Sequence, residues 1–180
     1  AIMAQFYSWE GGLRAPEFAR KFLEALRVTR AEQLTDMRAQ LRIETHMIED
    51  YDDMRALIRA HDIGYVVFND HIPHKRLEEG RKPARLTGTA LKSGRSPEAH
   101  LALMQALHAR RAEVPGALKE FAQNLLADGC LLGSHDDHRQ EDRALFRDMG
   151  AHISEFPETR EAEVLAAWHA HQEQQTRATG

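Results

Sequence analysis

The sequence predicts an α/β fold of parallel βα units, because short β-rich segments alternate with longer helical segments along the chain. Residues 39–45 alternate apolar and polar side chains, which is typical of a half-buried strand. Residues 65–68 form the short run Tyr-Val-Val-Phe, of the kind found in buried parallel strands. Right-handed crossovers would place the helices outside the sheet. Four such units are half of a (β/α)₈ barrel, and an open doubly wound sheet would use the same elements.

The first part of the chain predicts a loop, a helix, a strand and a second helix. Residues 1–12 are aromatic and end in two glycines, so we expect a loop or turn. Pro16 suits the first position of a helix, and apolar residues at helical spacing extend that helix to about residue 36. After the strand at 39–45, residues 50–61 predict another helix with acidic residues in its first turn.

The second part begins with a polar stretch, residues 71–94, whose length and lack of periodicity predict a functional or mobile loop. Helices are predicted from 96 to about 112 and from 115 to 129, each opened by a proline. Residues 130–134 predict a third strand and 152–156 a fourth, with a helix between them and a last helix after Pro157. Residues 172–180 are a polar tail without pattern.

Composition limits the classes of protein that the chain can represent. At 180 residues and 20.5 kDa it has the size of one domain, spanning 1–180. The net charge of −4 disfavours nucleic acid as a partner. No apolar run approaches the ~20 residues that cross a bilayer, and no secretion signal is visible, so we expect no membrane partner. A single cysteine, Cys130, suits a reducing cytoplasmic location.

Polar residues follow the predicted strands at the positions where a parallel α/β fold places its ligand site. Glu44 ends the first strand, His71 follows the second and His135 follows the third, while Glu155 ends the fourth. Imidazole and carboxylate groups that converge there would bind Zn, Mn or Fe. We therefore expect Glu44, His71 and His135 to hold a divalent metal.

Other histidines and acids have simpler interpretations. Asp136 and Asp137 could cap the helix that follows the third strand. His46 and His74 are interpreted as loop residues. Five histidines lie on predicted helices and are interpreted as surface or packing residues: His61, His100, His108, His169 and His171.

The polar stretch after the second strand is rich in cations, and either a solvated loop or a phosphate clamp would use them. The candidate substrate-binding residues are Lys75, Arg76, Arg81, Lys82 and Arg85, followed by Lys92 and Arg95.

Four segments carry a resemblance to a known family: LRIETH, VVFNDHIPHKR, LLGSHDDH and AHISEFPETREAE. They resemble the amidohydrolase-superfamily diphosphatases of phosphonate breakdown, which hydrolyse α-D-ribose 1-methylphosphonate 5-triphosphate and release pyrophosphate. The resemblance runs from about Met3 to His171. It implies a (β/α)₈ barrel whose strands four to seven are the four predicted here, and a phosphorylated small-molecule substrate.

The resemblance also implies a binuclear centre of two divalent metals, with Zn expected and Mn or Fe as alternatives. Glu44 would bridge the metals, and His71 and His135 would bind them. Asp136 and Asp137 of the SHDD motif are the candidate catalytic residues.

Two parts of the family pattern have no counterpart in this sequence: the His-x-Asp/His pair after the first barrel strand and the Asp after the eighth. We therefore expect the 180-residue chain alone to have no useful triphosphate-hydrolysing activity. The alternative hypothesis is a non-catalytic α/β fragment that self-associates and lacks a complete metal site. Under either hypothesis we expect a two-fold homodimer, because the barrel-lining face with Val66, Phe68 and Leu132 would otherwise be uncovered.

Overall fold

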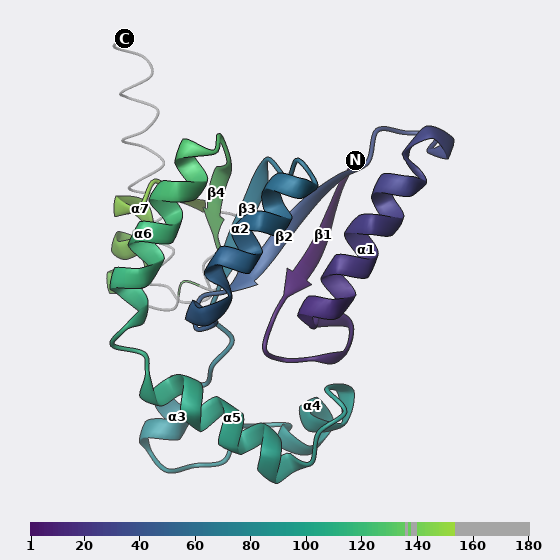
Figure 1. The fold of residues 1–180 in the computed structure, drawn as a ribbon. Coiled ribbons are helices and arrows are strands. Elements are labelled where there is room, and N and C mark those ends of the chain that lie inside the picture. Colours follow the sequence, from purple (N-terminus) through teal and green to yellow (C-terminus); the bar gives the residue numbers. More distant parts are fainter. Residues whose placement is uncertain (136, 138–139, 154–180) are drawn as a thin grey trace.

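The computed structural model describes residues 1–135, 137 and 140–153, and these form a parallel sheet with helices packed on it (Figure 1). All neighbouring strands are parallel, and their order in the sheet, β1-β2-β3-β4-β5, follows the chain without reversal. The strands are β1 (Ile2–Tyr7), β2 (Arg38–Glu44), β3 (Tyr65–Asn69), β4 (Leu131–Ser134) and β5 (His152–Ile153). The expected α/β fold of parallel βα units is therefore confirmed.

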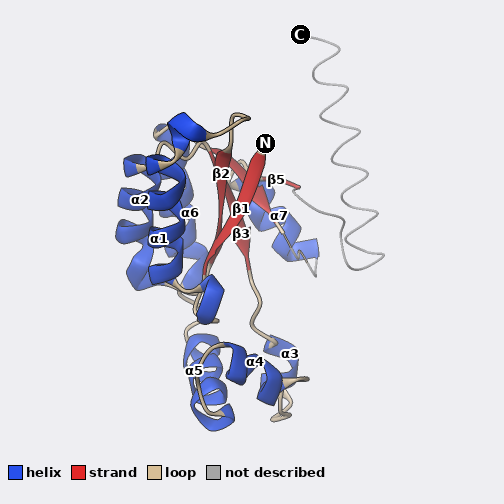
Figure 2. Ribbon diagram, turned by 90° about the vertical axis from the view of Figure 1, so that its right-hand side faces the viewer, coloured by secondary structure: helices blue, strands red, loops and turns tan. Residues whose placement is uncertain are grey.

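Helices α1 (Pro16–Val28), α2 (Tyr51–Ala60) and α6 (Val114–Ala127) lie together on one side of the sheet (Figure 2). Helix α7 (Gln140–Asp148) follows β4. Three short 3₁₀ turns also occur, at Gly12–Arg14, Arg30–Glu32 and Ile48–Asp50. The first helix ends at Val28, before the predicted residue 36, because the chain turns at Thr29 into the second of these.

The main core lies between the sheet and these helices. Val66, Phe68 and Leu132 have no exposed surface, and Phe68 stacks on Phe146 of α7 at 5.9 Å between ring centroids. The expectation that these three side chains line an uncovered face is therefore wrong, since they pack against the helices. Successive side chains of a strand alternate between the two faces of the sheet. Val66, Phe68 and Leu132 therefore point to the helices, and the residues next to them in each strand point away from the helices. The predicted homodimer therefore has no support from this face and stays a prediction.

The N-terminal segment is an edge strand and not the expected loop. β1 pairs with β2 from Ile2 beside Arg38 to Tyr7 beside Ile43. Gln5 occupies a core-facing position, where its amide donates hydrogen bonds to the carbonyl oxygens of Phe6 and Leu13 at 3.0 and 3.1 Å. A polar residue on the buried face disrupts the alternation by which a strand is recognised.

Residues 71–94 contain two short helices where the sequence predicts a loop. They contain α3 (His74–Glu78) and α4 (Leu86–Lys92), which are 5 and 7 residues long and so too short to show a helical period. With α5 (Pro97–Ala109) they form a helical lobe beyond the carboxyl ends of the strands (Figure 1). The lobe has a small core of its own, built from Trp9, Ile72, Leu86 and Met104.

The other predicted elements agree with the structure within a few residues. The strands predicted at 39–45, 65–68 and 130–134 are β2, β3 and β4, and the helices at 50–61, 96–112 and 115–129 are α2, α5 and α6. β5 confirms the start of the strand at 152–156, while its remainder, the helix after Pro157 and the tail at 172–180 lie outside the described residues. No helix among the described residues is long and apolar enough to cross a membrane.

Tyr7 gives the core a pH dependence that can be measured. Its side chain is 1% exposed, and burial is the main cause that raises the pKa of its phenol from 10 to about 12. Because the folded pKa lies above the unfolded one, the neutral phenol stabilises the fold below pH 10, and this contribution is lost as pH rises through 12. Between pH 9 and pH 11 the Tyr7→Phe variant should lose about 1 kcal/mol less stability than the original chain.

Urea unfolding of both proteins at the two pH values measures this difference. Titration of every other group contributes to both proteins and cancels. An equal loss of unfolding free energy in the two chains would show that Tyr7 ionises as readily in the folded state as in the unfolded state.

Candidate metal centre

The three predicted ligands lie at one edge of the sheet, where the parallel strands end. Glu44 is the last residue of β2 and pairs with Asn69, and His71 follows β3 by two residues. His135 follows β4 directly, and its backbone N–H donates to the Phe68 carbonyl at 3.0 Å. Glu155 lies outside the described residues. The strand ends therefore bring Glu44, His71 and His135 to the same edge of the sheet.

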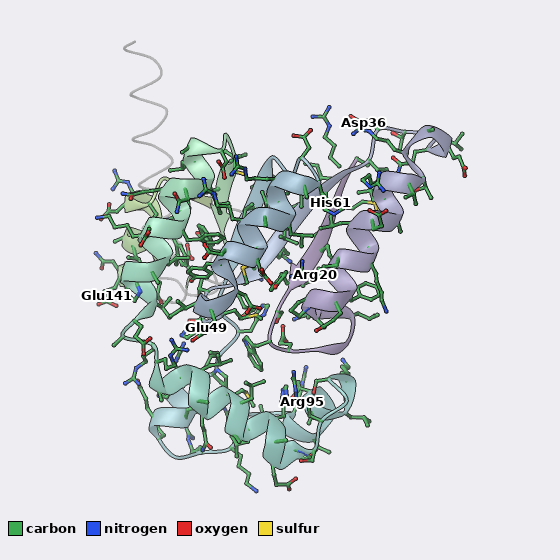
Figure 3. The ribbon with its side chains drawn as sticks, in the orientation of Figure 1. Arg20, Asp36, Glu49, His61, Arg95 and Glu141 are labelled. Carbon is green, nitrogen blue, oxygen red and sulfur yellow. The ribbon has the colours of Figure 1, made fainter. Side chains whose placement is uncertain are left out.

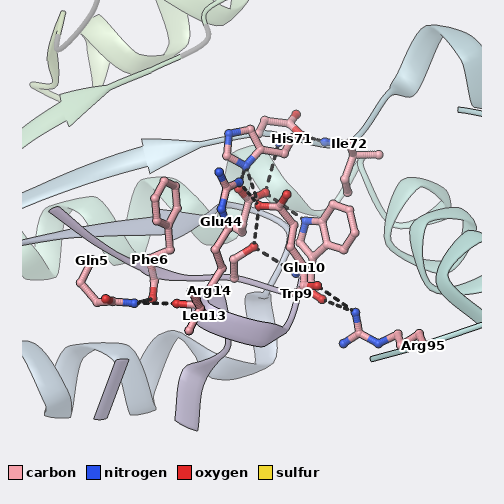
Figure 4. Close-up of polar contacts among 12 residues, drawn as sticks. Gln5, Phe6, Trp9, Glu10, Leu13, Arg14, Glu44, His71, Ile72 and Arg95 are labelled. Carbon is pink, nitrogen blue, oxygen red and sulfur yellow. Dashed lines mark hydrogen bonds and ion pairs between the residues drawn. The ribbon is translucent and has the colours of Figure 1, made fainter. Parts of the chain in front are cut away.

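Glu44 is completely buried, and one of its carboxylate oxygens is held by two N–H donors (Figure 4). The Trp9 indole donates to Oε2 at 3.0 Å, and the backbone N–H of His71 donates to the same atom at 3.2 Å. The second oxygen, Oε1, lies 2.6 Å from the Nδ1 atom of His71. The carboxylate therefore has a fixed orientation toward the imidazole.

His71 lies between two carboxylates. Its Nδ1 atom, besides contacting Glu44, is 3.0 Å from Oε2 of Glu10. Arg14 donates to the same Glu10 oxygen at 2.6 Å. One ligand atom from each of Glu10, Glu44 and His71 lies within 4.8 Å of the others. We call these three residues the Glu10–Glu44–His71 cluster.

The electrostatics of this cluster favour a cation. Burial raises the pKa of the Glu44 carboxyl, and the neighbouring His71 opposes that rise. Burial would also raise the pKa of Glu10, but hydrogen bonds from His71 and Arg14 outweigh it and lower the pKa to about 2. Glu10 is therefore ionised across the physiological pH range, and a positive charge between the two acids stabilises both.

Asn69, paired with Glu44 in the sheet, supplies an independent sign of a ligand site. Its side chain is 1% exposed, and neither its oxygen nor its nitrogen has a hydrogen-bond partner among the described residues. Buried amides are normally satisfied, by protein or by ordered water. An unsatisfied amide next to Glu44 in the sheet therefore fits a site that holds a hydrated divalent cation.

Two arginines lie close to the cluster on the same side of the sheet. The Cζ atom of Arg14 lies 4.2 Å from the centroid of the Phe6 ring, and the Cζ atom of Arg42 lies 5.3 Å from the same centroid. That ring in turn lies 6.2 Å from the ring of His71. Nothing in the sequence pattern selects these arginines, because Phe6 lies in a segment predicted to be a loop.

The predicted substrate-binding cations lie on the helical lobe. Lys75, Arg76, Arg81, Lys82 and Arg85 are all exposed, and Arg81 forms an ion pair with Glu79. Whether they contact a substrate stays a prediction.

Arg95 has a different role from the other cations of the lobe. It lies on the side of the lobe that faces the sheet (Figure 3) and donates to the carbonyl oxygens of Trp9 and Glu10 at 2.9 and 3.3 Å. The same loop meets α4 at Gly12, where a Cβ atom would lie 2.5 Å from the Lys92 carbonyl oxygen and φ is +57°. Only glycine fits there. The lobe thus fixes the loop that carries Trp9 and Glu10.

The SHDD motif contributes a buried ion pair. Asp137 is 7% exposed and accepts from the Ser134 hydroxyl at 2.7 Å and from Arg143 at 3.0 Å. Arg143 also donates to the Ala151 carbonyl at 2.6 Å, which joins β4 and α7 to the start of β5. Asp136 lies outside the described residues, and a catalytic role for either aspartate stays a prediction.

A second group of side chains that could hold a metal includes two histidines that the sequence analysis assigned to loops. The Nε2 atom of His74 lies 2.9 Å from Oδ2 of Asp70, and the Nδ1 atom of His46 lies 3.6 Å from Oδ1 of Asp70. Burial lowers the pKa of the His46 imidazole and favours its neutral form. The sequence missed this grouping because it depends on α3, just as it missed Glu10 because it depends on β1.

Comparison of the chain with protein-family models, with curated proteins and with solved structures finds no match.

The Asp137–Arg143 pair predicts a stability effect. Asp137→Asn leaves the guanidinium of Arg143 buried without its counter-charge, which should cost about 3 kcal/mol of unfolding free energy. Asp36→Asn is the matched control, because Asp36 pairs with Arg38 on the surface and should change stability by less than about 1 kcal/mol. Urea unfolding of both variants measures the contrast, and similar small losses would rule out a structural role for the buried pair.

Proposed function

We propose that this chain carries the metal site of an amidohydrolase-type hydrolase that acts on a phosphorylated small molecule. The observation that carries the proposal is the buried Glu44 carboxylate, held by two N–H donors and directed at His71 at the carboxyl edge of a parallel sheet. The substrate class is a ribose 5-triphosphate of phosphonate breakdown, cleaved to release pyrophosphate. That choice follows the resemblance of the four sequence segments.

The topology supports a barrel as the parent fold. Doubly wound sheets reverse their strand order at a switch point, whereas the strands of a (β/α)₈ barrel follow chain order. The five strands here follow chain order, and α1, α2 and α6 lie together on one side (Figure 2). β1 adds one strand before the four that the sequence predicted, so in such a barrel the five strands would be strands three to seven.

Glu10, Glu44 and His71 fit a divalent metal. Two carboxylates and an imidazole are a donor set that suits Zn²⁺, Mn²⁺ or Fe²⁺. His135 lies at the same edge and is the ligand candidate for the second metal of a two-metal centre. Because the other ligands of the family pattern have no counterpart in this sequence, we expect the chain alone to hold one metal at this cluster. When bound, the metal would lower the pKa of a coordinated water and offset the charge of a polyphosphate.

The residues of this chain have defined tasks around such a metal. Trp9 and the His71 backbone hold Oε2 of Glu44, which leaves Oε1 for coordination. Arg14 holds the Glu10 carboxylate ionised. Arg42 lies over the Phe6 ring, on the same face of the sheet as Glu44. A guanidinium at this place would bind a phosphate group in bidentate fashion. These groups favour an anionic substrate over a neutral amide.

Substitution of Glu44 tests the metal site directly. Glu44→Gln keeps the size of the side chain but removes the charge that faces His71, so Zn²⁺ affinity should fall by at least about 100-fold. Glu98→Gln, an exposed residue of α5, is the control and should bind Zn²⁺ like the original chain. Isothermal titration calorimetry measures both. The proposal fails if Zn²⁺ binds the Glu44→Gln variant as tightly as the original chain.

An activity assay tests the hydrolytic part of the proposal. Pyrophosphate release from a ribose 5-triphosphate, with Zn²⁺ or Mn²⁺ present, should be very slow for this chain, because the family pattern calls for ligands that the chain does not contain. A normal enzymatic rate that disappears in the His135→Ala variant would establish the reaction but overturn the expectation that the chain alone is inactive.

A further inference from the structure

We propose that His46, Asp70 and His74 form a second transition-metal site, distinct from the Glu10–Glu44–His71 cluster, that ties the helical lobe to the sheet. We call these three residues the His46–Asp70–His74 cluster. They come from three segments: the loop after β2, the loop after β3 and the first turn of α3. The inference does not rest on the proposed hydrolase function.

The three side chains already have nearly the spacing of a coordination sphere. One ligand atom from each lies within 4.8 Å of the others, and the His46 and His74 rings are 4.9 Å apart between centroids. Nε2 of His74 is 2.9 Å from Asp70, and Nδ1 of His46 is 3.6 Å from it. Around a tetrahedral Zn²⁺ with bonds of about 2.0–2.1 Å, neighbouring ligand atoms lie roughly 3.4 Å apart. Small side-chain rotations would therefore close the site.

The hydrogen bonding of His46 points to a ligand. His46 is 5% exposed, and its Nε2 atom has no hydrogen-bond partner among the described residues. The Nδ1 atom of the same ring faces Asp70 and lies 3.3 Å from the Thr45 hydroxyl, so Nε2 would reach the metal only after the ring turns. A buried imidazole nitrogen without a partner is costly, and coordination after that turn would satisfy it. Two imidazoles with one carboxylate select Zn²⁺ or Fe²⁺ over Mg²⁺ or Ca²⁺, which prefer oxygen ligands.

Two further contacts fix the ligands in place. The backbone N–H of Ile72 donates to Oδ1 of Asp70 at 3.0 Å, which orients the carboxylate. The Tyr51 hydroxyl donates to the Thr45 carbonyl at 2.5 Å, which fixes the backbone next to His46. The site is thus held by the sheet on one side and by α3 on the other.

His108 of α5 is a positioning residue for His74. The two Nδ1 atoms lie 2.7 Å apart, so His74 can bind a metal through Nε2 while its Nδ1–H donates to His108. Metal-binding histidines generally donate their second ring N–H in this way. Arg111 opposes this arrangement, because it donates to Nε2 of His108 at 3.2 Å and so favours the tautomer in which Nδ1 of His108 carries the proton. The Arg111 side chain is about half exposed, so it can move aside.

The two clusters share no residue. Asp70 and His71 are consecutive, yet Asp70 contacts His46 and His74 whereas His71 contacts Glu10 and Glu44. A metal at the His46–Asp70–His74 cluster would hold α3, and with it the lobe whose Arg95 fixes the loop of Trp9 and Glu10. Its expected effect is a more stable lobe, independent of any reaction at the other cluster.

The test is a titration of the full chain with Zn²⁺, and with Co²⁺ as a visible probe, in four variants. His46→Ala and His74→Ala should each lose one equivalent of metal, while His108→Ala should keep it with roughly 10–100-fold lower affinity. His61→Ala is the matched control, because His61 lies at the opposite end of the sheet from the lobe (Figure 3) and should bind like the original chain.

Glu44→Gln separates this inference from the proposed function. If both sites exist, Glu44→Gln loses one equivalent and His46→Ala loses the other. If only the His46–Asp70–His74 cluster binds metal, His46→Ala loses all binding and Glu44→Gln keeps it, which supports this inference and removes the hydrolase proposal. The inference is overturned if both variants lose the same single equivalent, or if His46→Ala and His74→Ala bind as the original chain does.

Hydrogen exchange provides a second measurement. Zn²⁺ should protect the amides of α3 and α5 from exchange in the original chain and in Glu44→Gln, but not in His74→Ala. His74 is partly exposed, with 27% of its side chain accessible, so its replacement should leave the fold intact even if His46→Ala does not fold. Equal protection of the lobe by Zn²⁺ in His74→Ala and in the original chain would also overturn the inference.

Discussion

The buried carboxylate of Glu44 is the constraint on which the arrangement at the carboxyl edge depends. Removing a carboxylate from water costs several kcal/mol unless charge and hydrogen bonds replace the lost hydration. Glu44 obtains both from segments far apart in the chain, the indole of Trp9 and the backbone and imidazole of His71. Trp9 is fixed in turn by Arg95 of the helical lobe. The satisfaction of one buried charge therefore links the sheet, the loop after β1 and the lobe.

Strand β2 shows how a single element builds both the core and the candidate metal centre. Leu41 and Ile43 are fully buried against the helices, while Arg42 and Glu44 point to the other face. The strict alternation of a strand makes this division unavoidable. A one-residue shift of register would place the carboxylate in the apolar core, so packing of the core also fixes the position of the acid.

The sequence predicted those parts of the fold whose patterns are local. Strands β2, β3 and β4 have apolar runs or clear alternation, and their ends located Glu44, His71 and His135 correctly at one edge. β1 was missed because Gln5 places an amide on the buried face, where its hydrogen bonds to two carbonyl groups make it compatible with burial. Trp9 and Glu10 were then missed as well, since their positions depend on the strand before them. Short helices have no detectable period, so α3 and the histidine it brings to Asp70 could not be foreseen.

Two cation sites beside each other would be stable only if the protein offsets their mutual repulsion. The two clusters together contribute three carboxylates, Glu10, Glu44 and Asp70. Three negative charges compensate most of the four positive charges of two divalent ions, and bound hydroxide or an anionic substrate would compensate the rest. Hydrogen bonds from His74 and the coulombic effect of His46 lower the pKa of Asp70 against the effect of burial, and Glu10 is held ionised by His71 and Arg14. Neighbouring groups thus keep Glu10 and Asp70 ionised, whereas burial raises the pKa of Glu44, so its negative charge depends on His71 or on a bound cation.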